Sequence, residues 1–208
     1  LDSETLSGAE GYRPVAERGE LDRWILGELH KATGKVVESM DAYDNYTAAS
    51  TLNGFVDSLS NWYVRRSRER FWSDQVDSTE KQDAYWTLYE CLLVTARLIA
   101  PFTPYLAELL WQTLAGVYGE RATLSVHLCD YPSRDEAVVD GELSEQMALL
   151  REIASLGRSA RMEARLKVRQ PLSAMEVVLA ESTHQAWLQE HDRSEEHTSE
   201  LQSRTNFV

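Results

Sequence analysis

The sequence LDRWILGELHKATGKVVESM, residues 21–40, decides the fold class. Its apolar residues recur at the spacing that places them on one face of a helix; they are Leu21, Ile25, Leu29, Ala32, Val36 and Met40. Turn-forming residues follow at 41–45, and a second amphipathic helix is predicted to run to about Trp72. Its apolar face contains Leu52, Phe55, Val56, Leu59, Trp62 and Tyr63. Consecutive amphipathic helices predict an all-α fold.

The third and fourth helices are predicted on either side of a proline. The third begins near Asp77 or Ser78, with capping-box chemistry, and ends at Pro101. Its apolar residues include Tyr85, Leu88, Leu92, Ala96 and Ile99. Thr103 is expected to cap the fourth helix, and Pro104 suits its first position. The predicted inner face of that helix contains Leu106, Leu109, Leu110, Leu114 and Val117.

A fifth helix is predicted from about Glu142 to a point before Pro171, after an irregular segment that contains a short strand at 124–128. Its inward residues are expected to be Leu143, Met147, Leu150, Ala154 and Leu156, and its outward stripe Arg151, Arg158, Arg161 and Arg165. Met175–Leu179 is compatible with a strand, and residues 182–189 with the start of a helix.

Both ends of the chain differ from this pattern. Residues 1–20 contain glycine and proline with little periodicity, so we expect a connector from an upstream domain. RSEEHTSELQS, residues 193–203, resembles the in-frame translation of a sequencing adapter, although its composition also permits a polar tail. We therefore predict a connector at 1–20, a helical domain at 21–166, a junction and the start of a C-terminal region at 167–192, and an artefact at 193–208.

Composition excludes several classes of protein. The chain has 208 residues, of which 43% are hydrophobic, and its net charge is −13, which argues against indiscriminate coating of nucleic acid. It has no apolar run near the roughly 20 residues that cross a bilayer and no signal-peptide pattern, so we expect a cytoplasmic protein. Cys91 and Cys129 lack metal-ligand spacing, which favours buried or partly buried thiols over a zinc site.

Two basic islands occur in this acidic chain. Residues 61–70 contain four arginines and one glutamate, and residues 151–170 contain six basic residues and two glutamates. In and beside the first island, aromatic residues flank the arginines. This combination suits structured RNA because guanidinium groups bind phosphates and stack on bases. On composition alone, an exposed charged helix face with aromatic neighbours in the core is the stronger interpretation.

The first island also carries a family resemblance. LSNWYVRRSRERFW, residues 59–72, resembles the anticodon-binding domain of isoleucyl-tRNA synthetases. LDRWILGELHK at 21–31, LIAPFTPYLAELLWQ at 98–112 and KVRQPLS at 167–173 occur in the order and spacing of that family. The resemblance implies the helical bundle of the class I synthetase anticodon-binding domain, followed by the start of a small α+β C-terminal region.

The resemblance also implies a function and a set of contact residues. The parent enzyme would join isoleucine to its tRNA with ATP and magnesium, and the chain contains neither the HIGH-like nor the KMSKS-like motif of the catalytic domain, so we expect this piece to be inactive alone and to use no cofactor. Its partners would be isoleucine tRNA and the missing catalytic and editing domains. The predicted tRNA-binding residues are Arg65, Arg66, Arg68, Arg70, Lys167 and Arg169.

Several alternatives remain open at this point. Trp62 is expected in the core, although stacking on a base is the competing role. Lys167 and Arg169 match a block that serves either as a hinge or in tRNA contact, and Gln170 and Pro171 equally suit a helix end. The competing functions are the anticodon domain of valyl-tRNA synthetase and a stand-alone helical module whose arginines meet an acidic protein.

Overall fold

The chain forms two compact units, Leu1–Asp140 and Gly141–Val208, and each is described by itself. The structure is a computed structural model that describes residues 9–74, 78–167, 170, 174–179, 183–191 and 204–207. The division after Asp140 falls inside the predicted 21–166 domain, whose boundaries remain predictions.

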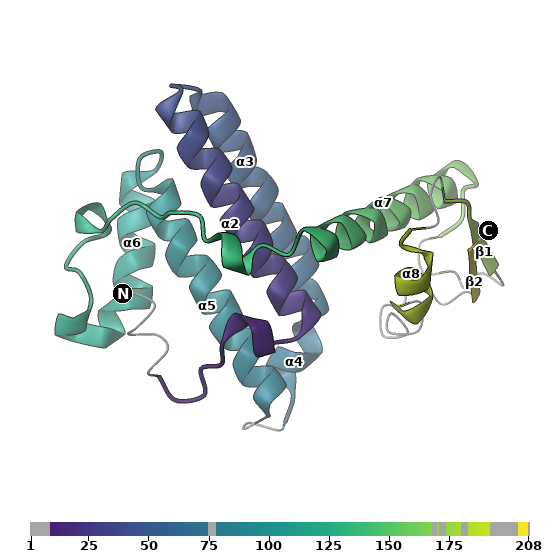
Figure 1. The fold of residues 1–208 in the computed structure, drawn as a ribbon, viewed down its shortest axis with the longest axis horizontal. Helices are drawn as coiled ribbons and strands as arrows, with labels where there is room; N and C mark the ends of the chain where they lie inside the picture. Colours follow the sequence, from purple (N-terminus) through teal and green to yellow (C-terminus); the bar gives the residue numbers. More distant parts are fainter. Residues whose placement is uncertain are drawn as a thin grey trace. The chain divides into compact units, whose positions relative to one another are not determined.

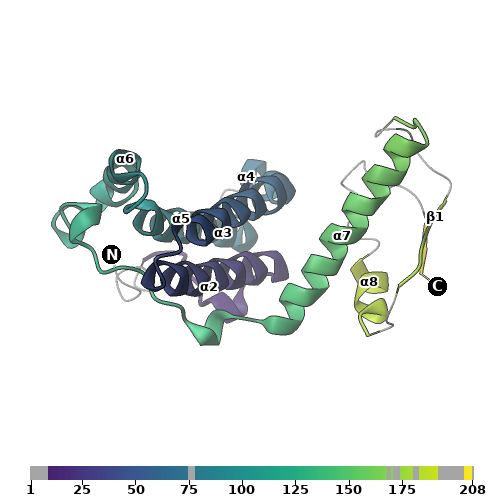
Figure 2. The same ribbon diagram turned by 90° about the horizontal axis from the view of Figure 1, so that it is seen from above.

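The first unit is built on a helical hairpin. Helix α2 (Glu20–Asp41) is followed, after a short turn, by α3 (Asn45–Asp57). Figures 1 and 2 both show α2 beside α3 and α5. The side chain of Asp44 caps α3 by accepting a hydrogen bond from the Thr47 amide at 3.0 Å. The predicted apolar face of α2 is confirmed, since Ile25, Leu29 and Val36 are buried.

The helix that follows the turn is not a uniform α-helix. After α3 the backbone passes through a π-helical segment, η2 (Ser58–Val64), and continues as α4 (Arg68–Trp72). The predicted end near Trp72 is confirmed. The predicted apolar face is also confirmed except at Val56, which is exposed. A π-helical turn contains more residues than an α-turn, so η2 changes which side chains face α2 beyond Val64.

Helices α5 (Thr79–Ile99) and α6 (Pro104–Ala115) complete the bundle of the first unit. Ser78 caps α5 by accepting from the Lys81 amide at 3.3 Å, which confirms the predicted start; Asp77 lies outside the described residues. Pro104 occupies the first turn of α6 as predicted. Thr103 precedes it, but its hydroxyl donates to Ile99 O at 3.4 Å and makes no capping bond to α6.

The predicted inner face of α6 is wrong at Leu106 and Leu109, whereas Leu114 does pack against the core. Leu110 is half-buried, and the Val117 side chain lies outside the described part of the chain. Leu106 and Leu109 are exposed, Leu109 by 65%, whereas Ala107, Trp111 and Ala115 are buried. These three lie at i, i+4 and i+8 and pack with Leu93 of α5 in one core cluster. Tyr85, placed on the apolar face of α5 from its sequence, is likewise exposed. Leucines occupy so much of α6 that their periodicity does not distinguish its faces; the small alanines, which permit close helix contact, mark the buried one.

Short helical turns connect these elements within the first unit. They are η1 (Val15–Glu17), η3 (Gly116–Arg121), η4 (Val126–Leu128) and η5 (Glu136–Val138). The strand expected at 124–128 is therefore replaced by a 3-10 turn. Residues 129–138, called the strap below, cross α5 and α2: Tyr131 donates its hydroxyl to Leu98 O at 2.9 Å, and the Asp135 amide donates to His30 Nδ1 at 3.1 Å. Burial lowers the pKa of His30, in keeping with a neutral acceptor.

The second unit begins with α7 (Gly141–Glu163) and contains β1 (Ala174–Val177), α8 (Gln185–His191) and β2 (Arg204–Phe207). Strands β1 and β2 pair in parallel, with Ala174 opposite Arg204. The predicted strand near 175–179 and the helix near 182–189 are thus found. Two expectations for α7 are wrong: Leu156 is exposed, and Arg161 is buried.

The first unit and α7 confirm an all-α fold, with the β1–β2 pair confined to the C-terminal part of the chain. In the predicted artefact at 193–208, only residues 204–207 are described, so its origin remains a prediction. Among the described residues, no helix combines the length and apolar character that crossing a membrane requires.

The reassigned α6 face gives a direct test of the core. Trp111 is buried among Leu93, Ala107, Ala115 and Val126, and its indole donates to Thr123 O at 2.8 Å. We expect Trp111→Ala to lower the free energy of unfolding by about 3–5 kcal/mol because it leaves a cavity. The control Leu109→Ala, on the exposed face, should change it by less than about 0.5 kcal/mol. Urea denaturation measures both changes. Equal losses of unfolding free energy in the two variants would show that the leucine face of α6 is also part of the core.

Candidate nucleic-acid interface

The four arginines of the first basic island lie at and after the end of η2. Arg65 and Arg66 follow η2 directly, and Arg68 and Arg70 belong to α4. Arg65 and Arg68 are exposed. Arg66 is half-buried, and its guanidinium carbon lies 4.5 Å from the centroid of the Trp62 ring. Trp62 itself is buried, which confirms its predicted place in the core. Arg65 and Arg68 are therefore the members of this island that are most accessible to a polyanion.

Trp72, at the end of α4, is a surface aromatic residue that the sequence analysis did not single out. Its side chain is 73% exposed, and the Arg68 guanidinium carbon lies 5.5 Å from its ring centroid. The neighbouring Phe71 is buried and packs edge-on against Tyr85, so the next residue of the helix faces solvent. A cation beside an exposed indole ring is a combination found where proteins bind unpaired bases.

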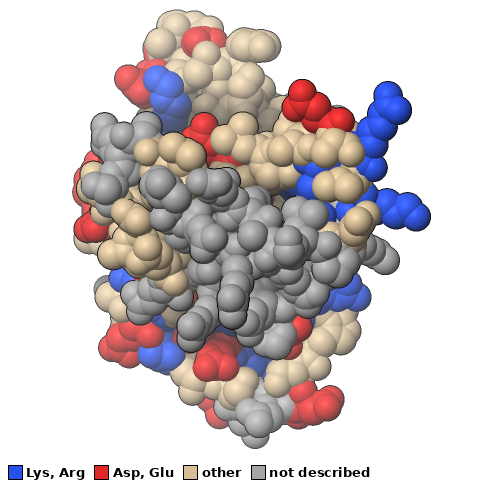
Figure 3. Space-filling view, turned by 90° about the vertical axis from the view of Figure 1, so that its right-hand side faces the viewer, with Lys and Arg blue, Asp and Glu red and all other residues tan. Residues whose placement is uncertain are grey.

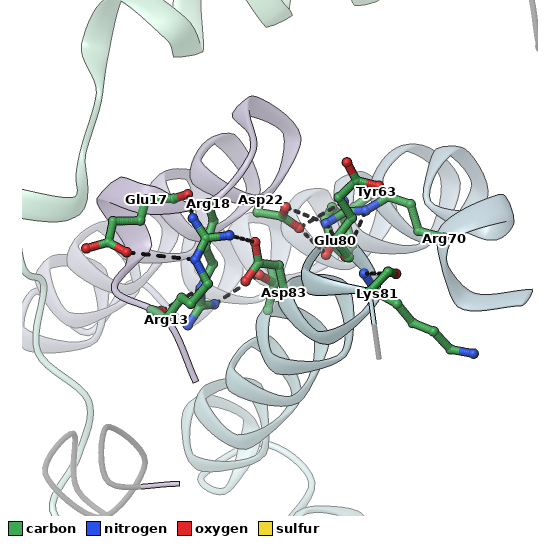
Figure 4. Close-up of polar contacts among 11 residues, drawn as sticks. Arg13, Glu17, Arg18, Asp22, Tyr63, Arg70, Glu80, Lys81 and Asp83 are labelled. Carbon is green, nitrogen blue, oxygen red and sulfur yellow. Dashed lines mark hydrogen bonds and ion pairs between the residues drawn. The ribbon is translucent and has the colours of Figure 1, made fainter. Parts of the chain in front are cut away.

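Arg70 lies on the opposite side of α4 and has a structural role (Figure 4). Its Nη1 and Nη2 donate to the two carboxylate oxygens of Asp22, at 3.1 and 2.6 Å. Its Nε and Nη2 also donate to the backbone oxygen of Glu80, at 3.2 and 2.9 Å. Because the guanidinium is hydrogen-bonded to residues of α2 and α5, we do not include Arg70 in the tRNA-binding surface proposed below.

Asp22 is fully buried and also accepts a hydrogen bond from Tyr63, whose hydroxyl lies 2.6 Å from Oδ1. Burial and the neighbouring carboxylate raise the pKa of Tyr63, so its phenol remains protonated and keeps donating. One carboxylate thus receives three hydrogen bonds from η2 and α4, which fixes both segments against α2. We call Asp22, Tyr63 and Arg70 the buried triad.

A second polar network lies beside the triad and joins the N-terminal segment to α5 (Figure 4). Arg18 is buried, and it donates to Thr87 Oγ1 at 3.0 Å and to a carboxylate oxygen of Glu90 at 2.7 Å. Arg13 pairs with Asp83 at 2.9 Å. Burial raises the pKa of both Glu90 and Asp83, and the arginines oppose this shift. The 13–18 segment is therefore an integral part of the first unit.

The second basic island differs from the predicted outward stripe. Arg161 donates from Nη1 to Gln170 O at 2.8 Å and to Lys167 O at 3.3 Å, so it closes the end of α7. Arg158 and Lys167 are exposed, whereas Arg169 lies outside the described residues. In Figure 3, basic side chains gather at the right of the view, and acidic side chains lie elsewhere among the residues that the structure describes.

The two thiols have the environments expected from the sequence. Cys91 is buried, and burial raises the pKa of its thiol; Cys129 is partly buried. His30 binds the strap through its ring, while His127 is exposed and His184 lies 3.9 Å from a Glu145 oxygen. In the part of the chain that the structure describes, no group of acidic, histidine or cysteine residues has the arrangement of a metal site.

Comparison with known proteins assigns the helical bundle that carries these arginines to a protein family. Residues 22–176 match the family described as the anticodon-binding domain of tRNA ligase. The chain belongs to this family. The resemblance inferred from residues 59–72 and the other blocks is thereby confirmed.

Three relatives show how much of a longer protein this anticodon-binding domain represents. Isoleucine–tRNA ligase of Dehalococcoides mccartyi strain CBDB1 is 47% identical over 166 residues, which is 80% of this chain and 16% of that protein. The Streptomyces coelicolor ligase is 45% identical over 79% of this chain and 15% of its own. The Thermus thermophilus ligase is 44% identical over 76% and 15%. The chain spans about one sixth of the length of these curated relatives.

Removing the charge of Asp22 tests whether the buried triad holds this anticodon-binding domain together. Asp22→Asn keeps the side-chain volume but leaves Arg70 without its counter-charge inside the protein. We expect the free energy of unfolding to fall by about 3 kcal/mol or more. The control is Glu38→Gln, whose partner Lys35 is exposed, with an expected change below about 1 kcal/mol. Urea denaturation near neutral pH measures both; a loss for Asp22→Asn no larger than the control would contradict the role of the triad.

Proposed function

We propose that this chain is the tRNA-binding part of an isoleucine–tRNA ligase and that it binds the anticodon arm of isoleucine tRNA. The observation that carries the proposal is the exposed pair Arg65 and Arg68 on a helical segment that the buried triad fixes in place. The relatives described above are isoleucine ligases, which supports isoleucine over valine as the amino acid of the parent enzyme.

The chemistry of this surface suits RNA. Exposed guanidinium groups bind phosphate oxygens through paired N–H donors, and such contacts position a protein on its nucleic acid without reading bases. Arg66, stacked on the buried Trp62, adds positive charge close to the same surface. Trp72 adds an exposed ring on which an unpaired base of the anticodon loop would stack.

The second island is a further part of the proposal. Lys167 is exposed, and Arg169 belongs to the same short block, KVRQPLS. We propose that both contact tRNA after the first surface has bound, because a long polyanion engages several separated cations. Their competing role is that of a hinge between domains.

The proposed reaction belongs to the parent enzyme. ATP and magnesium would bind its catalytic domain, and this chain would contribute placement of the tRNA without catalysis or a cofactor of its own. The catalytic and editing domains would then be its intramolecular partners. Translation places such an enzyme in the cytoplasm.

The first surface is tested by tRNA binding. We expect Arg65→Ala/Arg68→Ala to weaken binding of isoleucine tRNA at least about tenfold and to reduce the slope of log K against log salt by about 1 to 2, because up to two phosphate contacts disappear. The matched control, Arg121→Ala, removes an exposed arginine of η3 and should leave affinity within about twofold.

Filter binding at several salt concentrations, with circular dichroism to confirm folding, measures the effect. An unrelated tRNA should bind more weakly to the wild-type chain. Unchanged affinity in a folded double variant would show that the arginine surface does not carry tRNA binding and would favour an interaction with an acidic protein.

A further inference from the structure

The first unit contains a cleft that the proposed tRNA surface does not use. It has a volume of about 700 Å³ and lies between α2, α5 and the strap. Leu26 and Leu29 of α2 and Leu93 and Val94 of α5 form apolar walls. The rest of the lining is largely polar and includes the charged residues Glu90, Arg97, Asp130, Arg134, Asp135 and Glu136. The volume of the cleft lies in the range of small-molecule sites.

Arg97 of α5 is the polar group of interest in this cleft. Its Nε is buried and has no hydrogen-bond partner among the described residues. The same side chain lines a smaller adjoining cavity of about 200 Å³ together with Asp130 and Tyr131. A buried donor without an acceptor is costly, because it has lost its hydrogen bond to water. A turn of the Arg97 side chain that brings Nε to an acceptor in the cleft would remove this cost.

The acidic residues around the cleft leave Arg97 available. Glu90 is paired with Arg18 at 2.7 Å, and Glu136 with Arg134 at 2.8 Å. Asp135 accepts the Ala137 amide at 2.9 Å. Asp130 lies within electrostatic range of Arg97, but no hydrogen bond or ion pair joins the two side chains. An entering acceptor thus competes with no carboxylate already bonded to Arg97.

We propose that this cleft binds a small carboxylic acid with a hydrocarbon body, whose carboxylate accepts hydrogen bonds from Arg97. A carboxylate matches the edge of one guanidinium, which donates two parallel bonds to its two oxygens. A phosphate dianion needs more donors than one guanidinium supplies, and its second negative charge is repelled more strongly by the nearby Asp130. The apolar walls favour a ligand with a hydrocarbon chain. The proposal is independent of tRNA binding, since Arg65 and Arg68 do not line the cleft.

Octanoate is the probe for this site, with 1-octanol and inorganic phosphate as matched comparisons. We expect octanoate to bind the full 208-residue chain saturably and to shift the NMR signal of the Arg97 Nε–H group. Octanol, which has the same hydrocarbon body without the charge, should bind at least about tenfold more weakly. Phosphate should leave the signal unchanged.

Variants separate Arg97 from general apolar binding. Arg97→Met keeps a long apolar side chain, removes the donors and should weaken octanoate binding at least about tenfold. Arg121→Met, outside the cleft, should not change it. Failure of octanoate to saturate, equal binding of octanol, binding of phosphate at the same signal, or full affinity in a folded Arg97→Met chain would each overturn the proposal. If that variant does not fold, the octanoate and octanol comparison on the wild-type chain still decides it.

Discussion

The carboxylate of Asp22 is the interaction on which the rest of the first unit depends. It is fully buried in α2 and receives one hydrogen bond from Tyr63 and two from Arg70. The Arg70 guanidinium continues to the backbone of Glu80 at the start of α5. A buried charge is tolerated only when it is paired and bonded in this way, so the triad fixes α2, η2, α4 and α5 against one another.

This constraint explains why four neighbouring arginines have different roles. The π-helical turn and the buried Tyr63 set the rotation of α4, so that Arg70 faces the core and Arg68 faces solvent. The Arg66 guanidinium packs on the ring of Trp62. A chain with a net charge of −13 thereby presents a small positive surface of fixed geometry, which favours one orientation of a polyanion over diffuse attraction.

Sequence predicted the helices well and their contacts less well. Periodicity located the buried face of α2, and Pro104 and Ser78 located helix starts, because these signals are local. The same reasoning placed the leucine face of α6 in the core. Ala107, Trp111 and Ala115 are buried instead because they pack against α5, and this contact is not visible in the local sequence. Arg70 was predicted to bind RNA together with its neighbours. Its structural role was not predicted, because its partner Asp22 lies 48 residues away in the sequence. Trp72 was overlooked because its exposure depends on Phe71 filling the core.

We propose that Arg65 and Arg68 bind tRNA, whereas Arg70 stabilises the fold. NMR of arginine Nε–H groups, recorded as the anticodon stem-loop of isoleucine tRNA is added, tests both parts at once. We expect the signals of Arg65 and Arg68 to shift or broaden, and the signal of the Arg70 Nε–H group, which donates to Glu80 O, to stay in place. Movement of the Arg70 signal to the same extent, or unchanged signals of Arg65 and Arg68 in a complex that forms, would contradict it.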